Sequence, residues 1–380
     1  MSSSYYGPDP PPFMSPAMQG KMKKTSSVRV PPPSVDIFVN SVYYANWRIY
    51  RNERPSSLRY DIISHVYYAF AWVKADGTVY LSDEWADTQL QVDGHHGCLG
   101  AFLALKRQHR HLKLMLSIGG GGVGSQHFPT VASNPLAREN FGRTARNLVT
   151  THGLDGIDID WEHPSTLQEG TNYIALLGAI RNHLPSPAFL VTTALPAGTW
   201  ALRNINLSAA QHFLDHLNLM TYDFSGPWTD ACGHQAQLFA PSQPHNDAAR
   251  LSCSTAVEYV RSQGVPAQKI VLGVPVYGRS FLGAQTVGDR FAGHGGSDGT
   301  FDYRDLPRPG TVECNDVDLG AAFCVGGDGG FVSYDNPHSV KLKAAFVRQQ
   351  CLGGLFYWTG TADGHGRRSL VEAGFTGLHQ

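Results

Sequence analysis

Short apolar runs and longer helical patterns alternate along the chain from Ile37 onward. The runs are rich in β-branched and aromatic residues, which is typical of buried strands. Each is followed by a turn and then by a stretch in which apolar residues recur at helical spacing. The runs that we predict to be strands are Val39–Tyr44, His65–Trp72, Leu112–Ile118, Gly156–Trp161, Phe189–Ala194, Leu217–Tyr222, Ile270–Tyr277 and Gly354–Trp358.

Helix signals fill the gaps between these strands. In the stretch 134–151, Asn134 is placed as an N-cap, Pro135 occupies the first helical position, and Gly153 lies just beyond the end. Eight strands that alternate with helices predict an α/β fold, a (β/α)8 TIM barrel rather than an open sheet.

The gap after the seventh strand is too long for one helix. It is rich in Gly and Asp, with two strand-like pieces at 301–303 and 330–333. We therefore predict a small α+β insertion, about residues 281–338, between strand seven and its helix. We expect the rest of 36–380 to form the barrel.

Composition narrows the class of protein. Of the 380 residues, 42% are hydrophobic, enough for a large core, whereas only 16% are charged and the net charge is −1. Such a neutral chain lacks the basic field that nucleic-acid binding requires, and no apolar run is long enough to span a membrane. Aromatic residues make up 11%. They favour a site that stacks the apolar faces of sugars.

The first 35 residues are rich in Pro and Ser and have no apolar segment typical of a secretory signal. We expect a disordered tail there, because it has too little apolar surface to bury. The missing signal favours an intracellular or non-classically released protein. Met14, Met18 and Met22 are alternative starts, and a different first exon would allow secretion.

The fourth strand carries the decisive chemistry. Side chains alternate between the two faces of a strand, so Asp158, Asp160 and Glu162 face one way and their apolar neighbours the other. The apolar face must pack against the surrounding helices, so the acids point into the barrel. Successive inward side chains lie about 6–7 Å apart along the strand. Three carboxyls in such a lumen cannot all ionise, so at least one retains a proton near neutral pH and can serve as a general acid.

Other interpretations of these residues are weaker. A structural ion-pair network needs a Lys or Arg beside the acids, and that strand has none. The GxGxxG pattern that begins at Gly119 resembles a dinucleotide fingerprint, but no helix opens cleanly after it. The His residues are scattered without HExxH spacing, so we expect no metal and no cofactor.

These motifs together resemble a known family. The segment from Asp155 to Glu162 matches the DxxDxDxE signature of glycoside hydrolase family 18, the chitinases, and the resemblance runs from about Val42 to Phe375. It is most similar to the fungal-type endochitinases. It extends to the strand-end motifs Ser117-x-Gly119-Gly120, Met220-x-Tyr222-Asp223, Tyr277-x-Arg279 and Trp358.

The resemblance implies a retaining, substrate-assisted glycosidase. Glu162 would protonate the glycosidic oxygen, and the 2-acetamido oxygen of the substrate would attack C1 to form an oxazolinium ion. Asp160 would bind the acetamido N–H, and Asp158 would share a proton with Asp160. Tyr222 would hold the acetamido oxygen. The remaining residues implied to bind substrate or support the acids are Tyr43, Phe70, Ser117, Gly119, Gly120, Met220, Asp223, Arg279 and Trp358.

Three positions depart from the family pattern. Gly121 stands where many members have a Trp platform on the leaving-group side, and His163 and Thr359 are less usual. None of these removes the catalytic set, so we expect a chitinase that acts on the β-1,4 linkages of chitin or chito-oligosaccharides, as a monomer. The alternatives are an endo-β-N-acetylglucosaminidase and a chitin-binding lectin. The sequence does not decide between endo and exo action.

Overall fold

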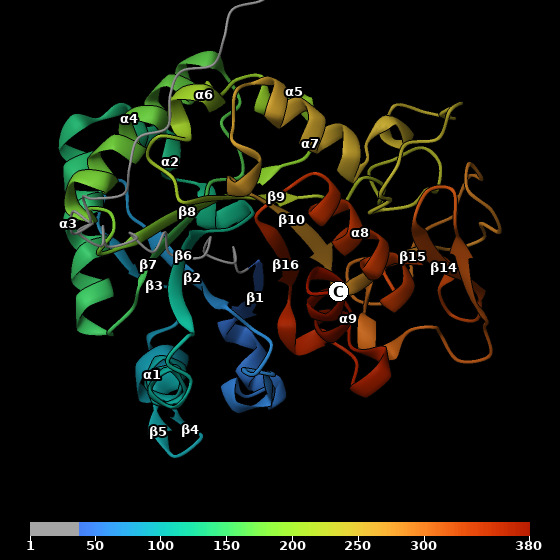
Figure 1. Ribbon diagram of the computed structural model, residues 1–380, viewed down its shortest axis with the longest axis horizontal. Helices are drawn as coiled ribbons and strands as arrows, with labels where there is room; N and C mark the ends of the chain where they lie inside the picture. The colour runs from blue at the N-terminus through green and yellow to red at the C-terminus, as the bar shows by residue number, and fades with distance from the viewer. Residues whose placement is uncertain (1–37) are drawn as a thin grey trace, which may run out of the picture. The chain divides into compact units, whose positions relative to one another are not determined.

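Eight parallel strands close into a barrel in the computed structural model, which describes residues 38–380 (Figure 1). The ring closes because the first strand pairs in parallel with both the second and the last. The predicted (β/α)8 barrel is thus confirmed. The barrel strands are β1 (Val39–Ala45), β2 (His65–Val73), β6 (Lys113–Gly119), β7 (Gly156–Asp160), β8 (Leu190–Pro196), β9 (His216–Met220), β10 (Ile270–Pro275) and β16 (Gly354–Trp358).

Helices surround this ring, most visibly α3 and α4 on the left of Figure 1. Asn134 caps α3 as expected, since its side chain accepts hydrogen bonds from the N–H groups of Leu136 and Ala137. The helices of the ring are α1 (Gly97–Gln108), α2 (Phe128–Ser133), α3 (Pro135–Thr151), α4 (Leu167–His183), the short α5 (Thr199–Leu202) and α6 (Leu207–Ala210), α7 (Cys253–Ser262), α8 (Pro337–Gln349) and α9 (Leu370–Leu378).

The main core lies between the strands and these helices. Ile157, Ile159 and Trp161 belong to this apolar layer and are buried, as the alternation of β7 predicts. Asp158 and Asp160 are buried as well but face the lumen, where the smaller cluster around Tyr43 lies. The two faces of one strand thus separate packing from chemistry.

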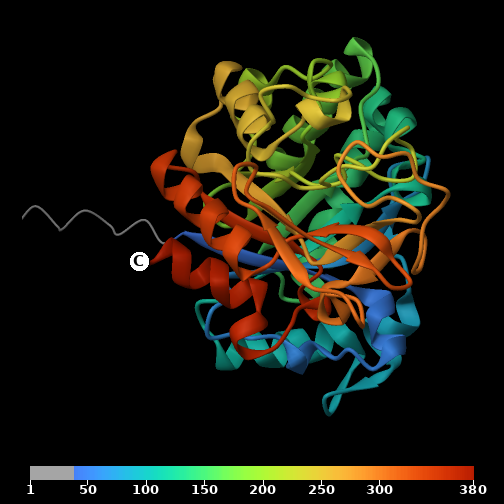
Figure 2. The ribbon, with the colours of Figure 1, turned by 90° about the vertical axis from the view of Figure 1, so that its right-hand side faces the viewer.

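A second, antiparallel sheet follows β10 and lies on the right of Figure 1; Figure 2 views it from that side. Its strand order is β12–β11–β15–β14–β13. The strands are β11 (Tyr277–Phe281), β12 (Thr300–Asp302), β13 (Glu313–Asp316), β14 (Ala321–Gly326) and β15 (Gly330–Tyr334), and the chain then enters α8.

The predicted seventh strand ended too late. Barrel strand β10 stops at Pro275, and Tyr277 instead begins β11 of the antiparallel sheet, paired with Asp302. Two strands of this sheet, β13 and β14, are absent from our sequence prediction.

Smaller elements complete the chain. A short strand, β3 (Val79–Leu81), pairs antiparallel with the end of β2. The strands β4 (Gln91–Val92) and β5 (His95–His96) pair with each other before α1. The predicted tail, residues 1–35, lies outside the described residues. Within 38–380, no helix has both the length and the apolar character needed to cross a membrane.

Candidate active site

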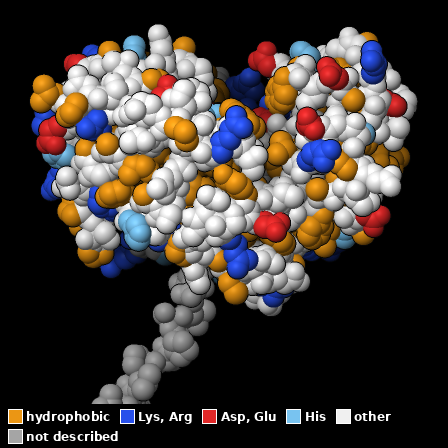
Figure 3. Space-filling view, turned by 90° about the horizontal axis from the view of Figure 1, so that it is seen from above, with side chains coloured by type: hydrophobic (Ala, Val, Ile, Leu, Met, Phe, Trp, Pro, Cys, Tyr) orange, Lys and Arg blue, Asp and Glu red, His pale blue; other side chains and the backbone are white. Residues whose placement is uncertain are grey.

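A cleft opens at the carboxyl ends of the barrel strands, the face on which TIM barrels carry their sites. The view from above shows a notch between the barrel body on the left and the lobe of β14 and β15 on the right (Figure 3). The cleft encloses about 270 Å³. Its lining includes Tyr43, Phe70, Gly121, Asp160, Glu162, His163, Pro196, Trp200, Met220, Tyr222, Asp223, Tyr277 and Trp358.

Asp158 is the deepest of the three acids and is completely buried. Its Oδ2 accepts hydrogen bonds from the hydroxyls of Tyr43 and Ser117, both at 2.8 Å. Its Oδ1 accepts from Thr192 at 2.7 Å and from the amide of Asn218 at 3.4 Å. Burial raises the pKa of Asp158, and these donors act in the opposite direction. Side chains from four other strands therefore fix this carboxyl in place.

Asp160, the next acid along β7, has a different environment. It is almost fully buried, yet its Oδ1 has no hydrogen-bond partner among the described residues. Burial, followed by the charges of Glu162 and Asp158, raises its pKa well above the usual range. An unpartnered buried carboxyl oxygen in a cleft is costly unless a ligand donates to it.

Glu162 stands just beyond the end of β7 and faces the cleft. Its backbone N–H donates to Ser125 Oγ at 2.8 Å, which fixes the turn. Burial, and then the charge of Asp223, raises the pKa of its carboxyl to about 7. Glu162 therefore stays protonated over much of the pH range in which an ordinary glutamate is ionised.

The expected proton sharing between Asp158 and Asp160 stays a prediction. Among the described residues, four donors contact Asp158 and no hydrogen bond joins the two carboxyls. The charge of Asp158 still raises the pKa of Asp160, so the two acids interact through space. The first acid of the signature, Asp155, lies outside the lumen. It pairs with Lys106 at 2.7 Å and accepts from the N–H of Leu114, which is a structural role.

Asp223 closes the cleft on the side of the antiparallel sheet. Its Oδ1 accepts from the Tyr277 hydroxyl at 2.7 Å and from Arg279 Nε at 2.8 Å. The backbone of Asp223 is left-handed, with φ of 59°, a conformation that Asp adopts more readily than most residues. The structure thus joins the predicted Asp223 and Arg279 in one cluster with Tyr277.

The glycines that end β6 allow close approach. Gly119 and Gly120 have φ of 125° and 89°. A Cβ on Gly119 would lie 2.1 Å from the Asp160 carbonyl oxygen, and one on Gly120 would lie 2.7 Å from the Phe70 ring. Only glycine fits both positions. Their role is to bring β6 against β7 and the site wall rather than to offer side chains.

Aromatic rings form the floor. Trp358 stacks on Phe70 with ring centroids 5.7 Å apart and lies 5.5 Å from the ring of Tyr43. Tyr222 and Met220 pack against the same lumen cluster and line the cleft. The predicted residues on β1, β2, β9 and β16 therefore converge on one surface.

Our sequence interpretation missed two exposed tryptophans, one that lines the cleft and one beside Arg279. Trp200 lines the cleft with 58% of its surface exposed, and its ring lies 5.6 Å from that of His163. Trp228 is 59% exposed and carries the Arg279 guanidinium 4.8 Å above its ring. The sequence could have indicated Trp200, because it lies just after the carboxyl end of the fifth barrel strand, β8, where site residues are expected.

His163 is the immediate neighbour of the acid. Its Nε2 lies 3.7 Å from Glu162 Oε2, and burial lowers its pKa to about 4. The imidazole is therefore already neutral at every pH at which Glu162 is ionised, so it does not stabilise an ionised Glu162. Within residues 38–380, no group of three or more His, Cys, Asp or Glu side chains is arranged to hold a metal.

The sequence of residues 39–363 matches the family described as glycosyl hydrolases family 18. The chain belongs to this family. Curated relatives cover most of its length. It is 36% identical to chitinase 1 of Aphanocladium album, over 90% of this chain and 85% of the relative. It is 38% identical to endochitinase 1 of Metarhizium robertsii, over 88% of this chain and 84% of the relative.

A solved structure agrees with this family 18 assignment. The family 18 chitinase of Cycas revoluta, in complex with (GlcNAc)3, superimposes with a TM-score of 0.78 and is 25% identical. The alignment covers 89% of this chain and 98% of that chain. The family membership predicted from the motifs is therefore confirmed over nearly all the described chain.

Proposed function

We propose that this family 18 hydrolase is a chitinase that cleaves β-1,4 linkages between N-acetylglucosamine units of chitin and chito-oligosaccharides. The observation that carries the proposal is the pair of acids at the end of β7. Glu162 has its pKa raised to about 7, and the neighbouring Asp160 has a buried Oδ1 that no donor of residues 38–380 contacts. The first supplies a proton, and the second can receive the N–H of a 2-acetamido group. The names of the relatives and the bound sugar of the Cycas revoluta enzyme point to the same substrate class.

The chemistry follows from these positions. Glu162 donates its proton to the glycosidic oxygen as the C1–O bond breaks, and the leaving sugar departs as an alcohol. The acetamido oxygen of the same substrate forms a bond to C1, which gives an oxazolinium ion and inverts C1. Water then attacks C1 from the opposite face and loses a proton to Glu162, so C1 returns to its original configuration.

The other acids support this path. Asp160 accepts the acetamido N–H and balances the positive charge of the oxazolinium ion. Tyr222 donates to the acetamido oxygen and holds it in line with C1. Asp158, fixed by hydrogen bonds from Tyr43 and Ser117, would share a proton with Asp160. These roles give one function to each predicted member of the lumen set.

The remaining predicted residues bind sugar. Trp358 and Phe70 supply an apolar floor for the face of the reacting ring, and Met220 packs beside them. Asp223 and Arg279 present charged groups to hydroxyls at one wall. The antiparallel sheet behind them serves as a subdomain that deepens the groove for a linear polymer.

The test is hydrolysis of chitopentaose by the purified chain, with product lengths read by mass spectrometry and product anomers by proton NMR. The proposal expects cleavage with initial formation of the β-anomer. Binding without cleavage would identify a lectin instead. Cleavage of the N-glycan core but not of chitopentaose would identify an endo-β-N-acetylglucosaminidase. The product lengths would also decide endo from exo action.

The rate should fall as pH rises through neutrality. Glu162 acts only when protonated, and its pKa of about 7 places the loss of its proton there. We expect kcat to reach a plateau below this pH and to decrease about tenfold for each further pH unit above it. A kcat profile on chitotetraose measures this. A rate that stays flat from about pH 4 to 9 contradicts the assignment of Glu162 as the acid.

Gly121 offers a gain-of-affinity experiment. A Cβ on this residue would lie 3.6 Å from Glu162 Oε1, an ordinary contact, so the backbone can accept a residue that has a Cβ. Gly121→Trp should restore a platform on the leaving-group side and lower KM for chitopentaose about 5- to 30-fold, since a stacked ring contributes about 1–2 kcal/mol. Gly121→Ala is the matched control, and an equal KM for both variants contradicts the prediction.

We also propose that the chain is a monomer. On the surface that Figure 3 shows, acidic and basic side chains are interspersed and hydrophobic ones are scattered. Sedimentation equilibrium would test this, with a mass near 41.4 kDa as the expected result.

A further inference from the structure

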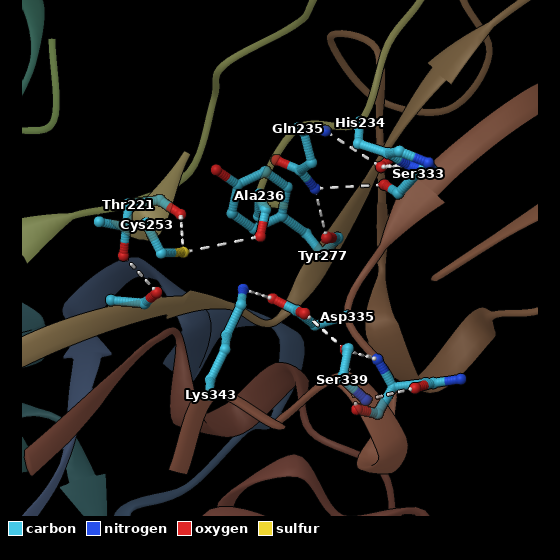
Figure 4. Close-up of polar contacts among 12 residues, drawn as sticks. Thr221, His234, Gln235, Ala236, Cys253, Tyr277, Ser333, Asp335, Ser339 and Lys343 are labelled. Carbon is cyan, nitrogen blue, oxygen red and sulfur yellow. Dashed lines mark hydrogen bonds and ion pairs between the residues drawn. The ribbon is translucent and has the colours of Figure 1, made fainter. Parts of the chain in front are cut away.

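A buried glutamine outside the cleft contacts both sides of the Asp223 cluster. Gln235 lies in the long loop between β9 and α7, next to His234, and none of its surface is exposed. Figure 4 shows its side chain directed toward Tyr277 and Ser333. Neither the acid chemistry nor the sugar contacts described above use this residue.

Gln235 joins three segments through three separate groups. Its side-chain Nε2 donates to the carbonyl oxygen of Tyr277 at 2.8 Å and, more weakly, to that of Ser333 at 3.3 Å. Its own carbonyl accepts the N–H of Phe224, the residue after Asp223, at 2.9 Å. Its N–H donates to Ser333 Oγ at 3.0 Å. Gln235 thus contacts both the backbone next to Asp223 and Tyr277, which donates to the Asp223 carboxylate.

The antiparallel sheet completes this clamp. Ser333 of β15 lies opposite Arg279 of β11 in the sheet register. Arg279 and Tyr277 both donate to the same oxygen of Asp223. The position of the Asp223 carboxylate therefore depends on the contacts that join β11, β15 and the loop at Gln235.

We propose that Gln235 is a positioning residue for the general acid, acting through Tyr277 and Asp223 to hold a negative charge beside Glu162. This inference rests on the proposed function. A fixed carboxylate near Glu162 favours the protonated acid, whereas a displaced one no longer opposes its ionisation.

Other titratable groups around Glu162 do not replace this effect. Asp160 and Tyr222 face it from the lumen, and His163 follows it in the chain. Tyr222 is neutral because burial raises its pKa well above the usual range, and burial likewise keeps His163 neutral. Asp160 and Asp223 are thus the acidic groups beside it, and Asp223 is the one that Gln235 can move.

The test is the pH dependence of kcat on chitotetraose for wild type and for Gln235→Met, which preserves side-chain length but removes the amide donor. The alkaline midpoint should move to lower pH by about half a pH unit, since the charge that raises the pKa of Glu162 is no longer held. The value of kcat on the acid plateau should fall about 3- to 10-fold because Tyr277 lines the cleft.

Gln237→Met is the matched control. Gln237 is a buried glutamine two residues along, and its Nε2 donates at 2.6 Å to a loop carbonyl without touching Tyr277. Its variant should lose a similar amount of stability in thermal unfolding but keep the wild-type midpoint. If Gln235→Met does not fold, Ser333→Ala removes the oxygen that holds the Gln235 N–H and should move the midpoint in the same direction.

A double-mutant cycle tests whether Gln235 acts on Glu162 through Tyr277 and Asp223. Tyr277→Phe breaks only the bond to Asp223 and should move the midpoint as Gln235→Met does, and the double variant should move it no further. Additive shifts, or a Gln235→Met midpoint equal to wild type, overturn the proposal. An inactive wild type would instead contradict the proposed function, so the two failures remain distinct.

Discussion

Glu162→Gln is expected to lower kcat on chitotetraose by about three orders of magnitude or more. The amide has nearly the same shape as the carboxylic acid but cannot donate a proton to the leaving oxygen. KM should change little, because the floor of Trp358 and Phe70 is intact. Steady-state rates with products separated by mass would measure both constants.

Glu258→Gln is the control for this variant. Glu258 is exposed on the outer face of α7, so its substitution tests the effect of the amide chemistry without touching the lumen. A Glu162→Gln variant that folds, binds and retains more than about a tenth of wild-type kcat would show that the proton comes from another group.

Asp160→Asn should have the second largest effect, a loss of about 100- to 1000-fold in kcat. The carboxylate oxygen that has no partner in the structure is replaced by an amide that bears no charge, so the oxazolinium ion loses its balancing negative group. Because the acetamido N–H binds in the ground state as well, KM should rise. The measurement is the same kcat and KM determination on chitotetraose, with circular dichroism to check the fold.

A buried aspartate elsewhere provides the comparison. Asp87 is fully buried outside the lumen, where it accepts from Tyr68 and Asn46, and burial raises its pKa to about 6. Asp87→Asn should reduce the free energy of unfolding but leave kcat within about twofold. Equal losses of kcat in both variants would mean that Asp160 matters for folding rather than for the reaction.

Much of the fold could be predicted from the sequence because two periodicities dominate it. The alternation of β7 separates Ile157 and Ile159 from the acids, and the repeat of strand and helix determines the barrel. The antiparallel sheet was harder to predict from the sequence. Its strands β13 and β14 are only partly buried, and buried and exposed residues do not alternate cleanly along them.

The candidate site was predictable where it sits on strand ends and not where it depends on loops. Asp158, Asp160 and Glu162 follow from one strand. By contrast, Gln235 reaches Ser333 across 98 positions in the chain, through a loop that lacks regular structure. No local pattern encodes such a contact, because it exists only after the barrel and the sheet have packed.

The antiparallel sheet is fastened to the barrel at both of its chain connections. At one end β10 continues into β11 after a single residue, Val276. At the other, Asp335 forms a fully buried ion pair with Lys343 of α8 at 2.5 Å, a pair that would be expensive to separate (Figure 4). The wall of the groove is therefore anchored at both chain connections, so we expect it not to swing like a lid. A polymer chain meets a trough that already has its final width, so little ordering of the protein accompanies capture, and selection among chains rests on the shape of the trough.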